Sequence, residues 1–315
     1  MKSSSNPQEI ITRKETCLSS WRVRNRKTIA GAVFVAPALL VILVFFIYPA
    51  FLSFRFSFTD WNGINPKFNY VGFENFLFIL KSPQFKQLIY NTMFLIIVYV
   101  PILNILALFF AIVIYDIGGK LANFYKVILF LPNILSMVVV GVIWRVIYNP
   151  VFGPLAYILE KLGLGTLVQD WIGQKSTVLP ALSVSIIWYA VGFYLMIYLG
   201  GLSTIPNELY ESASVDGIRW HQRLIYITIP MIAQSATINI VISTIGILTV
   251  FDLPFVLTGG GPGFASQTMA LMVYFYAFKS FQEGYAMALA IILTIVTMAF
   301  AVIQLKLLRR RENVY

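Results

Sequence analysis

The feature that most constrains this sequence is a set of long apolar runs. A helix that crosses a lipid bilayer needs about 20 mostly apolar residues, because each residue advances it by about 1.5 Å through ~30 Å of hydrocarbon. Six stretches meet this length, at about residues 29–52, 88–115, 125–148, 178–200, 225–256 and 285–308. The sequence therefore predicts an all-α integral membrane protein with six transmembrane helices.

The composition supports a membrane protein. Of the 315 residues, 59% are apolar and 11% are charged, whereas a soluble domain has roughly 45–50% apolar and about 25% charged residues. The chain has too few charges to cover a water-soluble globule. This disfavours a soluble enzyme, a secreted disulfide scaffold, a disordered chain and a nucleic-acid-binding domain.

The distribution of basic residues predicts the orientation. Although the net charge is +10, the positive charges gather at the two chain ends rather than along one face. Those at the ends are Lys2, Arg13, Lys14, Arg22, Arg24, Arg26, Lys27, Lys306, Arg309, Arg310 and Arg311. Two short loops add Lys120, Lys126, Arg219 and Arg223. The positive-inside rule places both termini and these loops in the cytoplasm, and an even number of crossings agrees.

The first apolar run is predicted to remain as a membrane span. Its roughly 24 residues exceed the 7–15 of a signal-peptide core, and no small-residue cleavage site follows it. We therefore expect a cytoplasmic N-terminal tail at 1–27, a transmembrane domain at 28–308 and a cytoplasmic C-terminal tail at 309–315.

Residues for metal or redox chemistry are scarce. Cys17 is the only cysteine, so no intrachain disulfide can form, and we expect an incidental exposed thiol. His221 is the only histidine, which leaves no His/Cys metal cluster to assemble and favours a role on a helix surface. We expect no catalytic residue, metal or cofactor on this chain.

Prolines recur within or beside the apolar runs. They are Pro37, Pro49, Pro101, Pro132, Pro180, Pro230 and Pro254. A proline removes a backbone donor and bends a helix, and neighbouring helices must then satisfy the freed carbonyl. Ordinary kinks and a transporter-like bundle with a cavity both remain open.

The loop between the fourth and fifth runs is polar and is predicted to begin with a short helix. Thr204 is a candidate N-cap and Pro206 falls in the expected first turn. Glu208 and Glu211 follow early in the helix, where acids suit its positive end.

The end of this helix is marked by Gly217, directly after Asp216, because glycine suits the left-handed position that closes a helix. A second amphipathic stretch starts at Ile218 and continues into the fifth run. The loop is either a connector resting on lipid headgroups or a docking element for a partner. Two acids and few basic residues suit anionic lipid poorly, which favours a partner.

The loop resembles a signature of inner-membrane permease subunits of binding-protein-dependent ATP-binding-cassette importers. That signature is Glu-Ala-Ala, three residues, Gly, nine residues and Ile-x-Leu-Pro. This chain has Glu211-Ser212-Ala213, then Gly217, then Ile227-Thr228-Ile229-Pro230, with the spacing preserved. Ser212 replaces the first alanine and Ile229 replaces the leucine.

The resemblance implies the transmembrane domain of a type I importer, with a cytoplasmic coupling helix at 203–223 that sits in a cleft of an ATPase subunit. The coupling residues it implies are Glu208, Glu211, Ser212, Ala213, Asp216 and Gly217. ATP and Mg²⁺ would bind the partner, because this chain contains no G-x-x-x-x-G-K-[ST] motif.

Two further segments resemble the carbohydrate-uptake subclass, of maltose type and glycerol-3-phosphate type. The first covers 57–63 and 70–76 in the predicted first external loop, and the second is the Gly-rich stretch 257–262. Residues 259–263 lie on the predicted external side, so we expect a tight turn there rather than a phosphate cradle.

Candidates for the substrate path are aromatic, small and polar residues of the fourth and fifth runs. They are Tyr189, Phe193, Ser243, Gly246, Ile247, Val250 and Asp252. Ser243, Ile247 and Val250 share one helical face. Positions that contact substrate in maltose-type relatives align with Ser243, Gly246, Ile247 and Val250. Three of the four are apolar here, which suggests a different ligand or polar groups supplied by the partner permease. Bundle packing is the alternative for the aromatic residues.

Two charged residues lie near predicted outer ends of spans. Asp252 and Arg145 are candidates for a gate or a site, because charges inside membranes are often functional. Solvation at the interface is the alternative, and a pairing between the two is a hypothesis.

The resemblance favours a non-catalytic sugar-importer permease, with an oligosaccharide as the first expectation and a glycerol-phosphate-type solute as the second. It implies a bacterial or archaeal inner membrane, a second homologous permease in a heterodimer, a cytoplasmic ATPase dimer and an external solute-binding protein. A secondary solute carrier without an ATPase remains the alternative. An intramembrane enzyme is disfavoured, since it needs a histidine cluster, paired carboxylates or a Ser/Lys dyad.

Overall fold

The computed structural model describes the backbone of residues 30–312 and the side chains of residues 30–309. The predicted N-terminal tail with Cys17, and residues 313–315, lie outside this range. The chain divides into two units, residues 1–55 and 56–315. The tail and domain boundaries expected from the sequence therefore stay a prediction.

The described part of the first unit is one long apolar helix. It spans Ala30–Phe56 with a mean hydropathy of 2.8, and no residue of its most apolar window is buried. A π-helical turn, η1 (Leu43–Ile47), precedes α2 (Tyr48–Phe56), and the Tyr48 N–H donates to the Leu43 carbonyl. Pro49 explains this wider turn, because a proline cannot continue a regular α-helical ladder.

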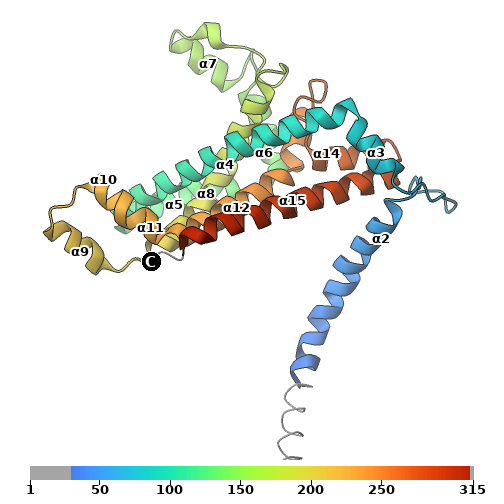
Figure 1. Cartoon of the computed structure of the whole chain (residues 1–315). Coiled ribbons are helices and arrows are strands. Elements are labelled where there is room, and N and C mark those ends of the chain that lie inside the picture. Colours follow the sequence, from blue (N-terminus) through green and yellow to red (C-terminus); the bar gives the residue numbers. More distant parts are fainter. Residues whose placement is uncertain (1–29, 313–315) are drawn as a thin grey trace, which may run out of the picture. The chain divides into compact units, whose positions relative to one another are not determined.

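Four helices form the centre of the second unit. They are α4 (Pro83–Ile117), α8 (Val178–Leu202), α12 (Ala233–Leu248) and α15 (Glu283–Glu312). They run side by side in Figure 1, and α4 contacts both α8 and α12 while α15 packs on α12. Leu103, Leu182 and Leu195 are fully buried between them. Three of the predicted spans, at 88–115, 178–200 and 285–308, are confirmed by α4, α8 and α15.

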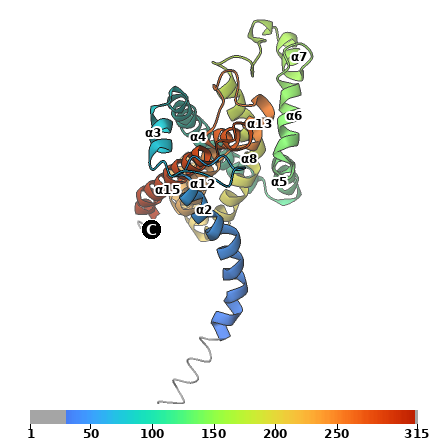
Figure 2. The same ribbon diagram turned by 90° about the vertical axis from the view of Figure 1, so that its right-hand side faces the viewer.

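The third predicted span is not one continuous helix. It consists of α5 (Gly119–Ile134) and α6 (Met137–Ile147), which meet at a bend of 99°. Pro132 weakens the ladder at this point, and the Ser136 hydroxyl then caps α6 by accepting from the Val138 N–H at 3.3 Å. Figure 2 shows α5 and α6 along one side of the central helices.

The fifth predicted span is also broken. A bend of 69° separates residues 220–231 from α12, and α12 ends at Leu248 instead of continuing to 256. Helix α13 (Asp252–Thr258) starts afresh. Pro254 would clash with the Val250 carbonyl in a continuous helix, and that carbonyl instead accepts from the Thr268 hydroxyl at 2.8 Å. With each bent pair counted as one span, up to six spans are present.

Short helices connect these elements. They are α3 (Glu74–Lys81), α7 (Pro154–Lys161), η2 (Gly165–Leu167), α9 (Asn207–Val215), α10 (Trp220–Arg223), η3 (Leu224–Thr228), α11 (Ile229–Met231), α14 (Met269–Tyr274) and η4 (Phe275–Lys279). In Figure 1, α9 and α10 project beyond one end of the central helices, while α3 lies at the other end. Among residues 30–312 the extended pairing is limited to the isolated bridge between Thr59 and Tyr70.

The segment 57–76 folds as a clasp on the start of α15. The Asn75 side-chain amide donates to the Ser57 and Thr59 carbonyls at 2.9 and 2.8 Å. The Gly284 N–H donates to the Trp61 backbone carbonyl at 2.8 Å. A Cβ at Gly284 would lie 2.0 Å from the Thr59 carbonyl oxygen, so only glycine fits. This sequence segment thus has a structural role at the α3 end of the molecule.

Candidate functional site

The start of α9 differs from the sequence prediction. Thr204 is not the N-cap, because its hydroxyl donates back to the Gly201 carbonyl at 2.7 Å, in the last turn of α8. Pro206 is the residue before the helix, in an extended conformation, and no side chain caps α9. The helix therefore begins later than its first capping signal suggested.

The end of α9 is as predicted. Gly217 adopts a left-handed conformation with φ of +70°. The Ile218 N–H donates to the Ala213 carbonyl at 2.9 Å, which is the bond expected when such a glycine closes a helix. The chain then turns sharply into α10, which keeps α9 and α10 as separate short elements.

Most predicted coupling residues lie on the exposed surface of α9 and the turn after it. Glu208, Glu211, Ser212, Asp216 and Gly217 are exposed, whereas Ala213 is buried. Val215 shares this surface and is 88% exposed. These exposed acids and Val215 together make up the outer surface of α9.

The residues that hold α9 in place were not predicted from the sequence. Arg223 of α10 lies with its guanidinium 5.1 Å from the centre of the Tyr210 ring on α9. The Tyr210 hydroxyl lies 3.2 Å from that of Thr228. The same guanidinium forms an ion pair with Asp116, in the last turn of α4, at 3.8 Å. Trp220 also donates to the Asp116 carboxylate, at 3.4 Å.

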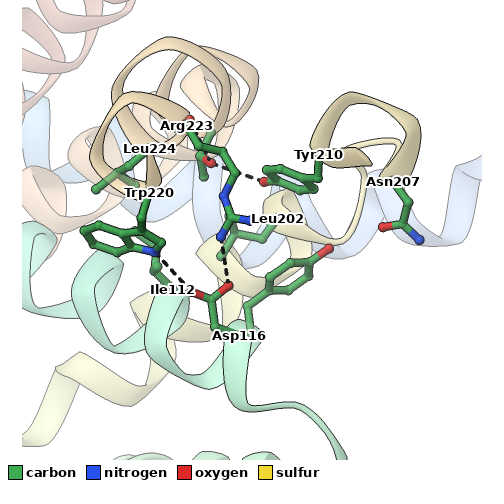
Figure 3. A pocket seen from close by; sticks show the side chains of 10 residues that line it. Ile112, Asp116, Leu202, Asn207, Tyr210, Trp220, Arg223 and Leu224 are labelled. Atoms are coloured by element: carbon green, nitrogen blue, oxygen red, sulfur yellow. Dashed lines mark hydrogen bonds and ion pairs between the residues drawn. The ribbon is translucent and has the colours of Figure 1, made fainter. Parts of the chain in front are cut away.

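Figure 3 shows these side chains converging between the ends of α4, α9 and α10. They line a cavity of about 130 Å³, together with Leu202 and Asn207. An acid at the end of a long apolar helix was the available sequence signal for Asp116. His221 lies exposed on α10, as expected for a helix surface.

The predicted substrate-path residues divide into two groups. Ser243, Ile247 and Val250 are buried against the chain's own helices. The Ser243 hydroxyl accepts from the Asn104 amide at 3.1 Å and donates to the Ile240 carbonyl at 3.0 Å. These three residues therefore face the packed core in this conformation.

The other candidates are accessible. Gly246 lies on the exposed face of α12 with Ile242 and Ile245, and Phe193 is exposed on α8. Tyr189 is half-buried on α8, and Asp252 is exposed in the first turn of α13.

The hypothetical pair of Arg145 with Asp252 is not formed in this structure. The Arg145 guanidinium instead donates to the carbonyls of Val256 and, at 3.4 Å, Leu257, at the C-terminal end of α13. Asp252 lies in the first turn of the same helix. Each charge therefore complements one end of the helix dipole, which explains both positions without a pair.

Comparison with known proteins identifies the chain. The family described as binding-protein-dependent transport system inner membrane component matches residues 77–314. The chain belongs to that family. The resemblance drawn from residues 211–230 is thereby confirmed, and the protein is a multi-pass membrane permease.

Curated relatives match this permease over most of their length. The probable ABC transporter permease protein YurN of Bacillus subtilis is 32% identical over 283 residues, covering 90% of this chain and 97% of YurN. The diacetylchitobiose uptake system permease protein NgcF of Streptomyces coelicolor is 31% identical over 306 residues, covering 92% and 86%.

A solved structure confirms the fold of the permease. A chain of a bacterial ABC transporter involved in the import of the acidic polysaccharide alginate has a TM-score of 0.80 and 24% identity, covering 93% of this chain and 99% of that one. A second structure of the bacterial alginate transporter, in complex with a periplasmic protein bound to an alginate pentasaccharide, has a TM-score of 0.79 at the same identity. The predicted all-α membrane fold of a type I importer subunit is therefore correct.

The Gly-rich stretch of the permease forms a tight turn. Gly259 closes α13 in a left-handed conformation, and the Gly261 N–H donates to the Thr258 carbonyl at 3.1 Å. The Ser266 hydroxyl donates to the Gly261 carbonyl at 2.6 Å and fixes the far side of the turn. Within the described part of the permease, no group of three or more His, Cys, Asp and Glu residues is placed to hold a metal ion.

Proposed function

We propose that this permease is the transmembrane subunit of an ATP-driven, binding-protein-dependent sugar importer, with an oligosaccharide as its substrate. The observation that carries the proposal is the outlying helix α9, whose exposed acidic and apolar surface lies within the matched family region. The names of NgcF and of the alginate transporter support a carbohydrate substrate.

The exposed surface of α9 is where a separate ATPase would bind. Glu208 and Glu211 offer charge to a basic cleft, and Val215 offers an apolar anchor. ATP and Mg²⁺ would bind an ATPase dimer, so this chain supplies no catalytic residue. Closure of that dimer would displace α9 and change which side of the bundle is open.

This function requires α9 and both chain termini to face the cytoplasm. The basic residues near this end, Lys120, Lys126 and Arg219, support that orientation. The clasp at 57–76 and the Gly-rich turn then face outward, where a solute-binding protein would dock. The membrane would be the inner membrane of a bacterial or archaeal cell.

A second, homologous permease would complete the translocation path. The accessible candidates on this chain are Tyr189, Phe193, Gly246 and Asp252, and the exposed apolar face of α12 would meet the partner or the path. Ser243, Ile247 and Val250 would join the path only if α12 turned relative to α4 and α8. Lipid would cover the remaining apolar surface, and nucleic acid has no part.

The test is purification of the protein from native cells through a tag on this chain. An ATPase and a second permease should copurify, and cells lacking only this chain should lose uptake of at least one member of a panel of radiolabelled mono- and oligosaccharides. Solute transport by vesicles that contain this chain alone would instead indicate a secondary carrier and refute the proposal.

A further inference from the structure

Helix α4 ends with an acid where its own dipole disfavours one. Asp116 lies in the last turn of this 35-residue helix, which has no basic residue in that turn. The C-terminal carbonyls of a helix carry partial negative charge and repel a carboxylate. The favourable contacts of Asp116 come from outside α4, in the ion pair with Arg223 and the hydrogen bond from Trp220.

The partner of Asp116 also holds α9. The Arg223 guanidinium packs on the Tyr210 ring, so a single side chain connects α9, α10 and α4, as Figure 3 shows. Along the backbone, α9 is joined to α8 by residues 203–206 and to α10 by residues 216–219. The contact through Arg223 is therefore a direct connection from α9 to α4 that the backbone does not provide.

Displacement of α4 would reach the polar centre of the bundle. Asn104 lies about 18 Å further along α4, at about 1.5 Å for each residue. Its side-chain Nδ2 donates to the Ser243 hydroxyl on α12, and its side-chain Oδ1 accepts from the Tyr198 hydroxyl on α8 at 3.0 Å. A shift at the Asp116 end is therefore transmitted to the two helices that carry the substrate-path candidates.

We infer that Asp116 and Arg223 are positioning residues that pass the displacement of α9 to α4. This inference rests on the proposed function, because it requires an ATPase to move α9. The side chains of Arg223 and Asp116 are 31% and 43% exposed. A pair this exposed is weak, so we assign it a role in positioning the two helices rather than in stabilising the fold.

The experiment measures both displacements in the full complex, purified through a tag on this chain and placed in nanodiscs. Spin labels on introduced p-acetylphenylalanine, which avoid partner cysteines, are placed at Leu307 on α15 and at either Asn207 on α9 or Val113 on α4. All three positions are exposed. Distances are measured by double electron–electron resonance without nucleotide and with a non-hydrolysable ATP analogue and Mg²⁺.

In the protein with Asp116 and Arg223 unchanged, the nucleotide should shift both the Leu307–Asn207 distance and the Leu307–Val113 distance. Asp116→Asn and Arg223→Gln should each preserve the shift at Asn207 and abolish the one at Val113, and the double variant should add no further loss. Arg223→Lys, which keeps a cation beside both the Tyr210 ring and Asp116, should retain the Val113 shift. Lys120→Gln, which changes a nearby exposed charge outside the pair, is the matched control and should preserve both shifts.

The outcomes separate the two proposals. If an ATPase copurifies and the Asn207 shift occurs, but the Val113 shift survives both Asp116→Asn and Arg223→Gln or is lost in Arg223→Lys, the inference is overturned and the proposed function stands. If Asp116→Asn and Arg223→Gln do not assemble while Arg223→Lys does, the pair is purely structural and the inference is also overturned. If no ATPase copurifies, or the Asn207 label does not respond to nucleotide, the proposed function itself fails.

Discussion

The Thr268 hydroxyl donates a hydrogen bond to the carbonyl oxygen of Val250 at 2.8 Å, and this bond joins the end of α12 to the start of α14. The Thr268 hydroxyl oxygen in turn accepts from the Leu271 N–H at 3.2 Å and caps α14. One buried hydroxyl therefore satisfies two backbone groups at the break that Pro254 creates.

Thr268→Val should destabilise the protein. It preserves the shape of the side chain but leaves the Val250 carbonyl without this donor, and an unsatisfied buried group costs about 1–3 kcal/mol. The measurement is the thermal unfolding midpoint of the purified protein in detergent. Thr294→Val is the control, because the Thr294 hydroxyl is exposed and bonds only to Ala290 in its own helix. Equal midpoints for both variants would contradict the role of Thr268.

Two glycines of α8 should respond oppositely to alanine. At Gly192 a Cβ would lie 2.1 Å from the backbone oxygen of Leu129, so Gly192→Ala must separate α5 from α8. Overpacking of this kind costs about 1–3 kcal/mol. At Gly200 a Cβ meets nothing within 4 Å, so Gly200→Ala should be neutral or stabilising by up to about 1 kcal/mol. The thermal unfolding midpoints of the two variants are the measurement. A lower midpoint for Gly200→Ala with an unchanged midpoint for Gly192→Ala would refute this account.

Asp60 should make its loop sensitive to acid. The Asn69 backbone N–H and side-chain amide donate to its carboxylate at 2.6 and 3.0 Å. These bonds hold the pKa of Asp60 below its ordinary value of 3.8. Because the pKa of Asp60 is lower in the folded protein than in the unfolded chain, its ionised carboxylate stabilises the loop at a pH above the unfolded-state pKa. This stabilisation is lost as the pH falls through the folded-state pKa.

The measurement for Asp60 is the fluorine NMR signal of 5-fluorotryptophan at Trp61, assigned by comparison with Trp61→Phe. The signal should change with a midpoint below pH 3.8, and Asp60→Asn should remove this transition. An identical titration in the Asp60→Asn variant would assign the change to another group.

The exposed apolar residue of α9 should matter for partner binding. Val215→Asp should lower the affinity of the ATPase at least about tenfold, since it would bury an unpaired carboxylate at the contact. Val151, in the turn before α7, has the same 88% exposure and gives the matched control Val151→Asp. Recovery of ATPase with the tagged chain is the measurement. Equal recovery with both variants would mean that the partner does not contact Val215.

The sequence predicted well what depends on local pattern. The lengths of the apolar runs identified α4, α8 and α15, and the conformational freedom of glycine identified the left-handed Gly217. The breaks at Leu135 and Thr249 were missed, because proline in an apolar run is compatible with a kink or a stop. The side chains of Ser136 and Thr268 form hydrogen bonds with backbone groups next to these helix breaks, and hydrophobic periodicity does not reveal such contacts.

The contacts around Asp116 were missed for a different reason. Trp220 and Asp116 are 104 positions apart in the chain, and the sequence pattern carries no information about which loop returns to which helix end. Ser243 and Ile247 lie on α12, whereas Val250 follows the end of that helix, and all three are buried. Amphipathic spacing defines a helical face but leaves open whether the core or a partner covers it.

The hydrogen bonds of Ser243 limit how tightly any solute can bind beside it. Its hydroxyl already has a donor in Asn104 and an acceptor in Ile240. An incoming sugar hydroxyl would replace one of these bonds with another of similar strength, so the net gain would be close to zero. Weak retention of this kind favours rapid release over capture, and the selection of the solute from a dilute medium would then belong to the protein that delivers it.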